Sequence, residues 1–391
     1  MKEWKKVKLK DITISITDGK HGDCKGQDNS GYYFISCKDV SNGTIHYENA
    51  RQITKEDFIE TDKRTNLATN DILITNSGTI GRMAFVKDIP ETRKTTFQKS
   101  VAIVKPNTDK VLPIYLYYLL QSKVSEFVNS SNGAAQKNLL LSTMREFELS
   151  IEESFSIQQR IATILSRYDS LIENYQKQIK LLEESAQRLY KEWFIDLRFP
   201  GHEYTKIVDG VPDGWEKKTL DSFCNVFTGK KNANQGVSNG KYKFFTCGDT
   251  PLLINSYIYD GPAIIISGNG SYTGRTTFYE GRFDLYQRTY ACTMKDMLDE
   301  NLIYGLFEIV KYELTNKISG GTHGAAIPYI VMSDVTKFDF LYEENIMQRF
   351  SSIMHNILSE SLSLLNQIRH LTEARDRLLP KLMSGEVIVN H

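Results

Sequence analysis

The segment GAAQKNLLLSTMREFELSIEE at residues 133–153 has a counterpart, GAAIPYIVMSDVTKFDFLYEE, at residues 324–344. The two segments align over their whole length without a gap. Self-similarity of this kind marks an internal repeat, and it decides the architecture before any single element is interpreted. This chain is therefore predicted to contain two copies of one structural unit.

Shorter matches occur in the same order in both halves of the chain. They are EWKKVKLKDI (3–12) with GWEKKTLDSF (214–223), TDGK (17–20) with TGK (228–230), FISCKDV (34–40) with FFTCGDT (244–250), ILITNSGTIGR (72–82) with AIIISGNGSYTGR (263–275), and FQKSVA (97–102) with YQRTYA (286–291). Because the order is kept throughout, one tandem duplication explains all of these matches.

Each copy begins with a segment of mixed character. Short runs of β-branched and aromatic residues alternate with Gly, Asn and Asp turns, which is typical of strands. Two apolar stretches, LPIYLYYLLQSKVSEFV (112–128) and NLIYGLFEIVKYEL (301–314), have the spacing of helices. The first part of each copy is therefore predicted to be an α/β domain.

Each copy ends with a segment of helical periodicity. Apolar residues at spacings of mostly three and four predict long helices that pair along a coiled-coil seam. The predicted seam comprises Ile157, Ile161, Ile164, Tyr168, Leu171, Tyr175, Ile179, Leu182, Ala186, Leu189 and Trp193 in the first helix, and Phe350, Ile353, Ile357, Leu364, Ile368, Leu371, Leu378 and Leu382 in the second. Antiparallel pairing would place the α/β domains at opposite ends of one rod, as a dumbbell with a pseudo-two-fold axis.

These features predict an α+β or mixed fold with four regions. They are an α/β domain at residues 1–152, a helical spacer at 153–203, a second α/β domain at 204–343 and a second helical spacer at 344–391. Two domains agree with a length of 391 residues, which exceeds what one hydrophobic core usually serves.

The composition, 40% hydrophobic and 25% charged, is that of a soluble globular protein. No apolar run approaches the ~18 residues of a membrane span, and the start MKEWKKVKLKD lacks the apolar core of a signal peptide. A cytoplasmic location and reduced cysteines are expected. The formal net charge is zero, with +4 in residues 1–150 and −1 in residues 206–342, so composition alone does not suggest a nucleic-acid binder and any cationic face has to be local.

The order α/β domain, long helix, α/β domain, long helix resembles the specificity subunits of type I restriction-modification systems, over essentially the whole chain. The segments that carry the resemblance are PDGW (212–215), SGTIGR (77–82), GNGSYTGR (268–275), IQQRIATIL (157–165) and ARDRLLPKLMSGEV (374–387). The last of these segments is the most specific.

The resemblance implies a non-catalytic subunit whose two target-recognition domains each read one half of a bipartite site in double-stranded DNA. It also implies that the helices act as a spacer and dock two methyltransferase subunits, which a restriction subunit joins. The complete complex would be an adenine DNA methyltransferase and type I site-specific deoxyribonuclease. No cofactor is expected in this chain, whereas its partners would use S-adenosylmethionine, ATP and Mg2+.

Catalytic motifs are missing from the sequence. An adenine methyltransferase would show an Asn/Asp-Pro-Pro-aromatic loop, but no two of the nine prolines are adjacent. A Walker A motif is missing because no Gly-Lys pair is followed by Ser or Thr. No metal site is predicted. A protein scaffold with two duplicated interaction domains on a coiled-coil rod, binding no DNA, stays open as the alternative function.

Polar residues that recur in the turn-rich loops are the candidates for a DNA-binding face. Arginine and lysine suit guanine edges or phosphates, whereas glutamine and asparagine suit adenine. The candidates are Lys20, His21, Arg82, Gln98, Lys99, Lys137, Asn138, Lys230, Lys231, Arg275, Gln287 and Arg288. In the structural alternative, each repeated Gly-Arg places its arginine against a carboxylate of its own domain.

Two further sets of equivalent residues in the repeated segments are predicted to have structural roles. Asp39 and Asp249 are predicted to be cap or turn residues, and Cys37 and Cys247 to lie in the core.

Apolar residues near the helix ends exceed what a two-helix seam needs. Such surplus predicts a surface that docks a partner, although heptad residues are usually core. The predicted docking residues are Tyr190, Trp193, Phe194, Leu378, Leu379, Leu382 and Met383.

Overall fold

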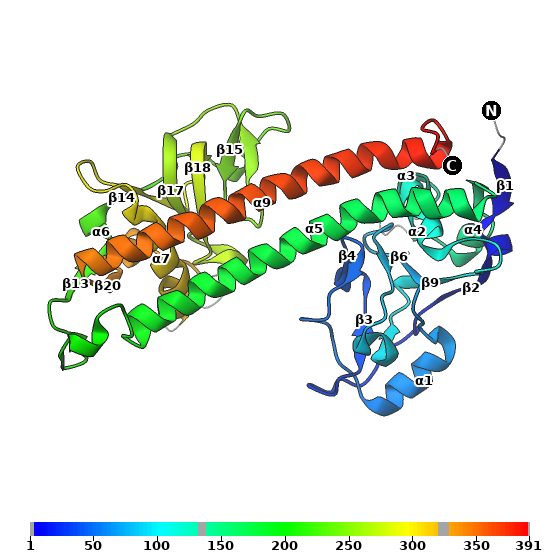
Figure 1. Ribbon diagram of the computed structural model, residues 1–391, viewed down its shortest axis with the longest axis horizontal. Coiled ribbons are helices and arrows are strands. Elements are labelled where there is room, and N and C mark those ends of the chain that lie inside the picture. Colours follow the sequence, from blue (N-terminus) through cyan, green and yellow to red (C-terminus); the bar gives the residue numbers. More distant parts are fainter. Residues whose placement is uncertain (1–3, 132–137, 320–327, 390–391) are drawn as a thin grey trace. The chain divides into compact units, whose positions relative to one another are not determined.

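The computed structural model describes residues 4–131, 138–319 and 328–389. The chain divides into two compact units, Met1–Glu173 with Ile368–His391 (unit 1) and Asn174–Gln367 (unit 2). Each unit combines one α/β domain with a part of each long helix, α5 (Phe155–Tyr190) and α9 (Glu344–Ser384) (Figure 1). Among the described residues, none of the helices combines the length and apolarity needed to span a bilayer.

Unit 1 is built on a four-stranded antiparallel sheet in the order β2-β9-β6-β7. Its strands are β2 (Thr13–Asp18), β6 (Ile72–Thr75), β7 (Met83–Phe85) and β9 (Val101–Pro106). Around it lie β1 (Lys5–Lys8) paired with β10 (Glu148–Ile151), β3 (Tyr33–Ile35) paired in parallel with β8 (Thr95–Phe97), β4 (Val40–Ser41) paired with β5 (Thr44–Ile45), and helices α1 (Lys55–Thr65), α2 (Pro113–Ser122), α3 (Val124–Asn129) and α4 (Leu141–Arg145).

The central strand β6 is buried on both faces because its four residues, Ile-Leu-Ile-Thr, are all apolar or hydroxyl. Successive side chains of a strand point to opposite faces. Ile72 and Ile74 accordingly lie in the core that α2 covers, whereas Leu73 lies in a second core with Ile35 and Phe97. Strands buried on both faces leave only their ends for polar side chains.

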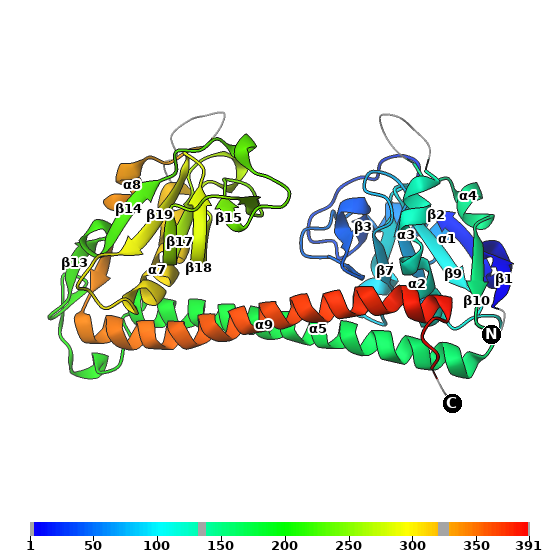
Figure 2. The ribbon, with the colours of Figure 1, turned by 90° about the horizontal axis from the view of Figure 1, so that it is seen from above.

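Unit 2 contains a six-stranded sheet in the order β14-β19-β17-β18-β15-β16. Its strands are β14 (Cys224–Thr228), β15 (Tyr242–Phe245), β16 (Leu252–Ile254), β17 (Tyr259–Ser267), β18 (Thr276–Leu285) and β19 (Thr289–Met294). The other elements are β11 (Ile207–Val208) paired with β12 (Val211–Pro212), β13 (Glu216–Thr219) paired with β20 (Asp339–Tyr342), and helices α6 (Leu220–Phe223), α7 (Leu302–Ser319) and α8 (Met332–Thr336). Helix α7 lies along this sheet (Figure 2).

The strand pairing confirms the duplication. Strands β2, β9, β6 and β7 correspond in order and direction to β14, β19, β17 and β18. The long β18 also takes the place of β8, because its last residues pair in parallel with β15 as β8 does with β3. The two copies differ in one connection, which runs from β3 to β6 in unit 1 and from β15 to β17 in unit 2. In unit 1 this connection contains α1, whereas in unit 2 residues 246–258 form only β16.

The long helices run antiparallel within each unit, as predicted. In unit 1, Ile161 and Leu165 near the start of α5 share a core with Leu382 near the end of α9. In unit 2, Tyr190 at the end of α5 shares a core with Phe350 near the start of α9. Hydrophobic burial therefore fixes the pairing at both ends of each helix.

The predicted seam is wrong at two positions. Leu171 is 42% exposed and Ile353 is 37% exposed, whereas the adjacent Ile172 and Met354 are buried. A helix with 3.6 residues per turn drifts from a strict heptad. Met354 also joins the core that contains the α/β domain of unit 2, so the buried face is set by that domain as well as by the partner helix.

Six of the seven predicted docking residues are buried in the chain's own cores, and Leu378 is half-buried against one of them. In unit 2, Tyr190 donates a hydrogen bond to Glu313 on α7, and Trp193 and Phe194 pack against Phe350. In unit 1, Leu379, Leu382 and Met383 lie in the core and Leu378 packs against it. The surplus apolar surface covers the α/β domains, which the heptad pattern does not reveal.

A π-helical turn, Lys191–Ile195, follows α5. The amide of Asp196 donates to the carbonyl of Lys191, five residues earlier, at 2.8 Å. This turn adds a residue to the helical register. Trp193 and Phe194 within this turn are both buried.

Asp169 on α5 connects three helices of unit 1. Its carboxylate accepts hydrogen bonds from the Tyr118 hydroxyl on α2 at 2.6 Å and from Nη1 of Arg375 on α9 at 2.6 Å. Burial, followed by the Asp169 charge, raises the pKa of Tyr118, so the hydroxyl remains a donor.

We predict that Asp169→Ala lowers the free energy of unfolding by roughly 1–3 kcal/mol, because Tyr118 and Arg375 lose their shared acceptor. Asp376→Ala is the matched control, since Asp376 binds the same guanidinium from an exposed position and should cost less than about 0.5 kcal/mol. Urea unfolding followed by circular dichroism measures both variants. Equal losses in the two variants would contradict the role given to Asp169.

Candidate nucleic-acid interface

The candidate DNA-binding residues gather at one end of each main sheet. In unit 1, β2 and β6 end where β7 and β9 begin, because neighbouring strands are antiparallel. In unit 2, β14 and β17 likewise end where β18 and β19 begin. Most of the candidates lie on loops that begin or end at these strand ends, whereas Asn138 lies between α3 and α4. The sequence placed the candidates on loops but did not predict their convergence.

Backbone hydrogen bonds connect the loops of unit 1. The amide of Lys99 donates to the carbonyl of Lys20 at 3.1 Å, and the amide of Asn76 donates to Ser100 at 3.0 Å. The amide of Leu139 donates to Asn76 at 2.8 Å, which brings the exposed Asn138 beside the same loop. Lys137 lies outside the described residues.

Unit 2 repeats this network. The amide of Gln287 donates to the carbonyl of Lys231 at 3.0 Å, and the amide of Gly268 donates to Arg288 at 2.9 Å. The amide of Ile330 donates to Gly268 at 2.9 Å. The two copies therefore share one backbone framework beneath different side chains.

The hydrogen bonds correct the predicted match of FQKS with YQRT by one residue. The equivalent bonds align Lys99 with Gln287 and Ser100 with Arg288, rather than Lys99 with Arg288. Strand pairing confirms this register, because Thr289 is the first residue of β19 as Val101 is of β9. The turn residues before the strand have thus diverged between the copies.

The glycine of the repeated Gly-Lys pair is required for steric reasons. A Cβ atom on Gly19 would lie 1.9 Å from the carbonyl oxygen of Phe97, and one on Gly229 would lie 1.7 Å from that of Leu285. Only glycine permits so close an approach of two backbone segments. These glycines hold the loop after β2 or β14 against the neighbouring turn.

Arg82 and Arg275 occupy equivalent positions but have different partners. Their carbonyls accept equivalent bonds from Thr75 at 2.8 Å and Ser267 at 2.9 Å. The Arg275 guanidinium lies 2.5 Å from Oδ1 of Asp249 and 5.2 Å from the centre of the Tyr272 ring. Arg275 therefore makes the ion pair that the structural alternative describes, with a carboxylate of its own domain.

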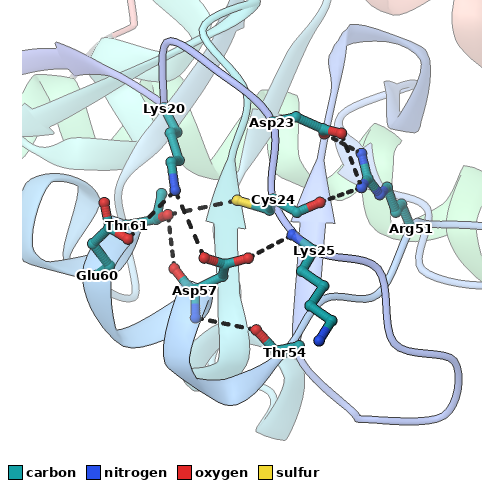
Figure 3. Close-up of polar contacts among 9 residues, drawn as sticks. All are labelled: Lys20, Asp23, Cys24, Lys25, Arg51, Thr54, Asp57, Glu60 and Thr61. Carbon is teal, nitrogen blue, oxygen red and sulfur yellow. Dashed lines mark hydrogen bonds and ion pairs between the residues drawn. The ribbon is translucent and has the colours of Figure 1, made fainter.

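Three other candidates are also paired with acids. Lys20 lies 3.8 Å from Asp57 and 3.5 Å from Glu60, both on α1 (Figure 3). His21 Nε2 lies 3.0 Å from Oδ2 of Asp18. In unit 2, Lys231 lies 3.8 Å from the buried Asp284.

Other candidate cations have no acidic partner among the residues that the structure describes and add accessible positive charge at the loop end of each unit. Within the described parts of the chain, the exposed side chains of Arg82, Lys99, Lys230 and Arg288 form no ion pair. Gln287 is exposed and Gln98 half-buried. These groups can bind phosphates or base edges.

The predictions for the repeated aspartates and cysteines hold only in part. Asp39 is a cap, because its carboxylate accepts the amide of Ser36 at 2.8 Å and its hydroxyl at 2.7 Å. Asp249 is not a cap but lies in the bend at residues 247–250, which agrees with a turn role, and its exposed carboxylate pairs with Arg275. Cys37 and Cys247 are half-buried at the loop end, rather than in the core.

The sequence interpretation missed the contribution of α1 and the loop beside it. Thr54 caps the helix by accepting the amide of Asp57 at 3.3 Å. Threonine followed by Glu56 and Asp57 in the first turn is a recognisable helix start. The absence of this segment from the second copy marks it as a point of divergence between the two domains.

The interface offers cationic and amide groups that can bind a ligand. In the described residues, no group of three or more His, Cys, Asp or Glu side chains is placed to hold a metal ion. Positive and amide groups on loops of this kind can select a polyanion by position and hydrogen bonding.

Comparison with known proteins identifies the family. The family model of the type I restriction modification DNA specificity domain matches residues 1–184 and 212–352. The type I restriction enzyme MjaIX specificity subunit of Methanocaldococcus jannaschii is 30% identical, over 99% of this chain and 94% of that protein. The EcoDI specificity subunit of Escherichia coli is 29% identical over 45% of this chain and 39% of its own length.

A solved structure supports the fold. The crystal structure of a type I restriction-modification S subunit from M. genitalium matches with a TM-score of 0.61 at 16% identity, over 97% of this chain and 96% of that chain. The fold class and the family expected from the sequence are both confirmed. The chain belongs to the DNA specificity family of type I restriction-modification systems, as a specificity subunit and thus a non-catalytic component.

Proposed function

We propose that this chain selects the DNA site of a type I restriction-modification complex by reading a bipartite sequence, with one α/β domain for each half. The observation that carries the proposal is the shared backbone framework at the loop ends of two domains whose exposed side chains differ. One framework with two sets of side chains suits two related readers with separate preferences. Membership of a DNA specificity family disfavours the scaffold alternative.

The charge distribution favours recognition within a larger assembly. The chain has a formal net charge of zero, and several loop cations are already paired with acids. Lysines and arginines that neutralise DNA phosphates release counterions from the DNA, and this release favours binding. Because few loop cations are unpaired, the chain alone should bind DNA weakly. The partner subunits would supply much of the enclosure around the duplex.

The helices are proposed to space the two readers and to dock the partners. Their ends are buried in the α/β cores, but several leucines between those ends are exposed, among them Leu171, Leu181, Leu362 and Leu365. Exposed apolar side chains on a helix suit packing against partner helices. Two methyltransferase subunits would bind there, and a restriction subunit would join them. These partners would use S-adenosylmethionine, ATP and Mg2+.

Adenine methylation of a plasmid library by the methyltransferase subunits, with and without this chain, tests the proposal. We expect methylation at one bipartite sequence only when the chain is present, since it alone would carry the sequence readers. Single-molecule sequencing measures the modified positions. Identical methylation patterns in the two samples would refute the proposed function.

Substitution of the equivalent arginines should affect different halves of the site. Arg82→Ala should cost roughly 1–3 kcal/mol of specific binding if the guanidinium contacts a base, and should relax one half only. Arg275→Ala should relax the other half. Arg349→Ala is the control, because Arg349 is exposed on α9, outside the loops. Half-site preferences of the assembled complex measure all three variants, and relaxation of both halves by one substitution would indicate a folding defect instead.

A further inference from the structure

Helix α1 packs against the loop that follows β2, and the described residues of the second copy contain no such helix. Phe58 on α1 shares a small core with Cys24 in the loop and with Phe34 and Ile53. In unit 2 the corresponding connection, residues 246–258, contains only β16. The loop at residues 20–25 therefore has a support that its counterpart after β14 lacks.

Asp57 makes the polar contact at the centre of this support. Its Oδ2 accepts a hydrogen bond from the backbone amide of Lys25 at 2.5 Å, and its Oδ1 lies 3.8 Å from Nζ of Lys20 (Figure 3). The carboxylate thus reaches both ends of the loop. Glu60, one turn later on α1, contacts only Lys20 and is 67% exposed on its side chain, against 23% for Asp57.

Arg51 fixes the same loop from another side. Its guanidinium donates to Asp23 at 2.5 Å and to the carbonyl of Cys24 (Figure 3). The hydrogen bond from Arg51 lowers the pKa of Asp23, so this carboxylate stays ionised at neutral pH. Both the backbone and one acidic side chain of the loop are thereby held in place.

The fixed loop begins at the candidate interface and has two further exposed polar side chains. His21 and the side chain of Lys25 are exposed, and the loop begins at Lys20, whose carbonyl binds the amide of Lys99. Arg82 and Lys99 lie at this same end of the sheet. A loop held before binding loses less conformational entropy on binding and adapts less readily to a wrong sequence.

From this arrangement we infer that Asp57 is a positioning residue that sets the sequence preference of the first α/β domain without touching DNA. It acts by holding the Lys25 amide, so that loop 20–25 keeps one shape. The inference rests on the proposed function and deepens it, because it locates a source of the difference between the two half-site preferences.

The test compares Asp57→Ala with Asp57→Asn in the complete complex with its methyltransferase subunits. An asparagine oxygen can still accept the Lys25 amide, whereas alanine cannot. Asp57→Ala should reduce discrimination at one half of the site by about tenfold, the size expected when a hydrogen bond to a charged group is lost. Asp57→Asn should retain most of that discrimination. Glu60→Gln, which leaves the Lys25 contact intact, should retain all of it.

Single-molecule sequencing of methylated plasmid libraries gives the preference at each half, and the half read by the second domain is an internal control. Unchanged discrimination in Asp57→Ala, equal loss in both halves, or equal loss in the alanine and asparagine variants would each overturn the inference. A wild-type complex without bipartite methylation would instead refute the proposed function.

Hydrogen exchange of the isolated chain provides a second readout that does not depend on activity. The amide of Lys25 should exchange at least tenfold faster in Asp57→Ala than in the wild type, and at nearly the wild-type rate in Asp57→Asn. Unaltered exchange in Asp57→Ala would show that Asp57 does not hold the loop and would overturn the inference, even if that variant failed to assemble.

Discussion

Burial of the central strands on both faces is the constraint on which the rest of the structure depends. In β6, Ile72 and Ile74 face one core and Leu73 faces the other, and β17 repeats this with Ile264 and Ile265. Helices α2 and α7 each cover one of those faces. A central strand buried on both faces offers no side chain to a ligand, so the loops at the strand ends are the part of the domain that can carry recognition. Because neighbouring strands are antiparallel, the loops after β2 and β6 and the loops before β7 and β9 lie at the same end of the sheet.

The two copies keep their backbone contacts and change their charges. The approach of Gly19 to Phe97 and of Gly229 to Leu285 fixes the same turn in both. Above it, Arg82 has no acidic partner among the described residues, whereas Arg275 is held by Asp249. An unpaired guanidinium can bind phosphate or base freely, while a paired one is oriented and partly neutralised. Divergence of this kind changes the preference of a domain without changing its fold.

The sequence allowed prediction of the duplication, the α/β domains and the long antiparallel helices, because repeats and periodicity extend over many residues. It did not allow prediction of every buried position on the helices: Leu171 and Ile353 fit the heptad but are exposed, and the α/β domains bury Met354 and the ends of both helices as well. The apolar residues around Trp193 seemed surplus for the same reason. The Arg275–Asp249 pair links residues 26 apart in sequence through the fold, and no local pattern encodes it. Helix α1, in contrast, carried a readable start signal at Thr54.

The central claim is that each α/β domain reads its own half of the site through its own loops. A chain in which residues 204–343 are replaced by a second copy of residues 1–152, assembled with the methyltransferase subunits, tests it most directly. Circular dichroism would first establish that the hybrid is folded, and sequencing of methylated plasmid libraries would then give its target. The account predicts a new site in which both halves carry the base preference of the first domain. Methylation of the original asymmetric site by the folded hybrid would contradict the account.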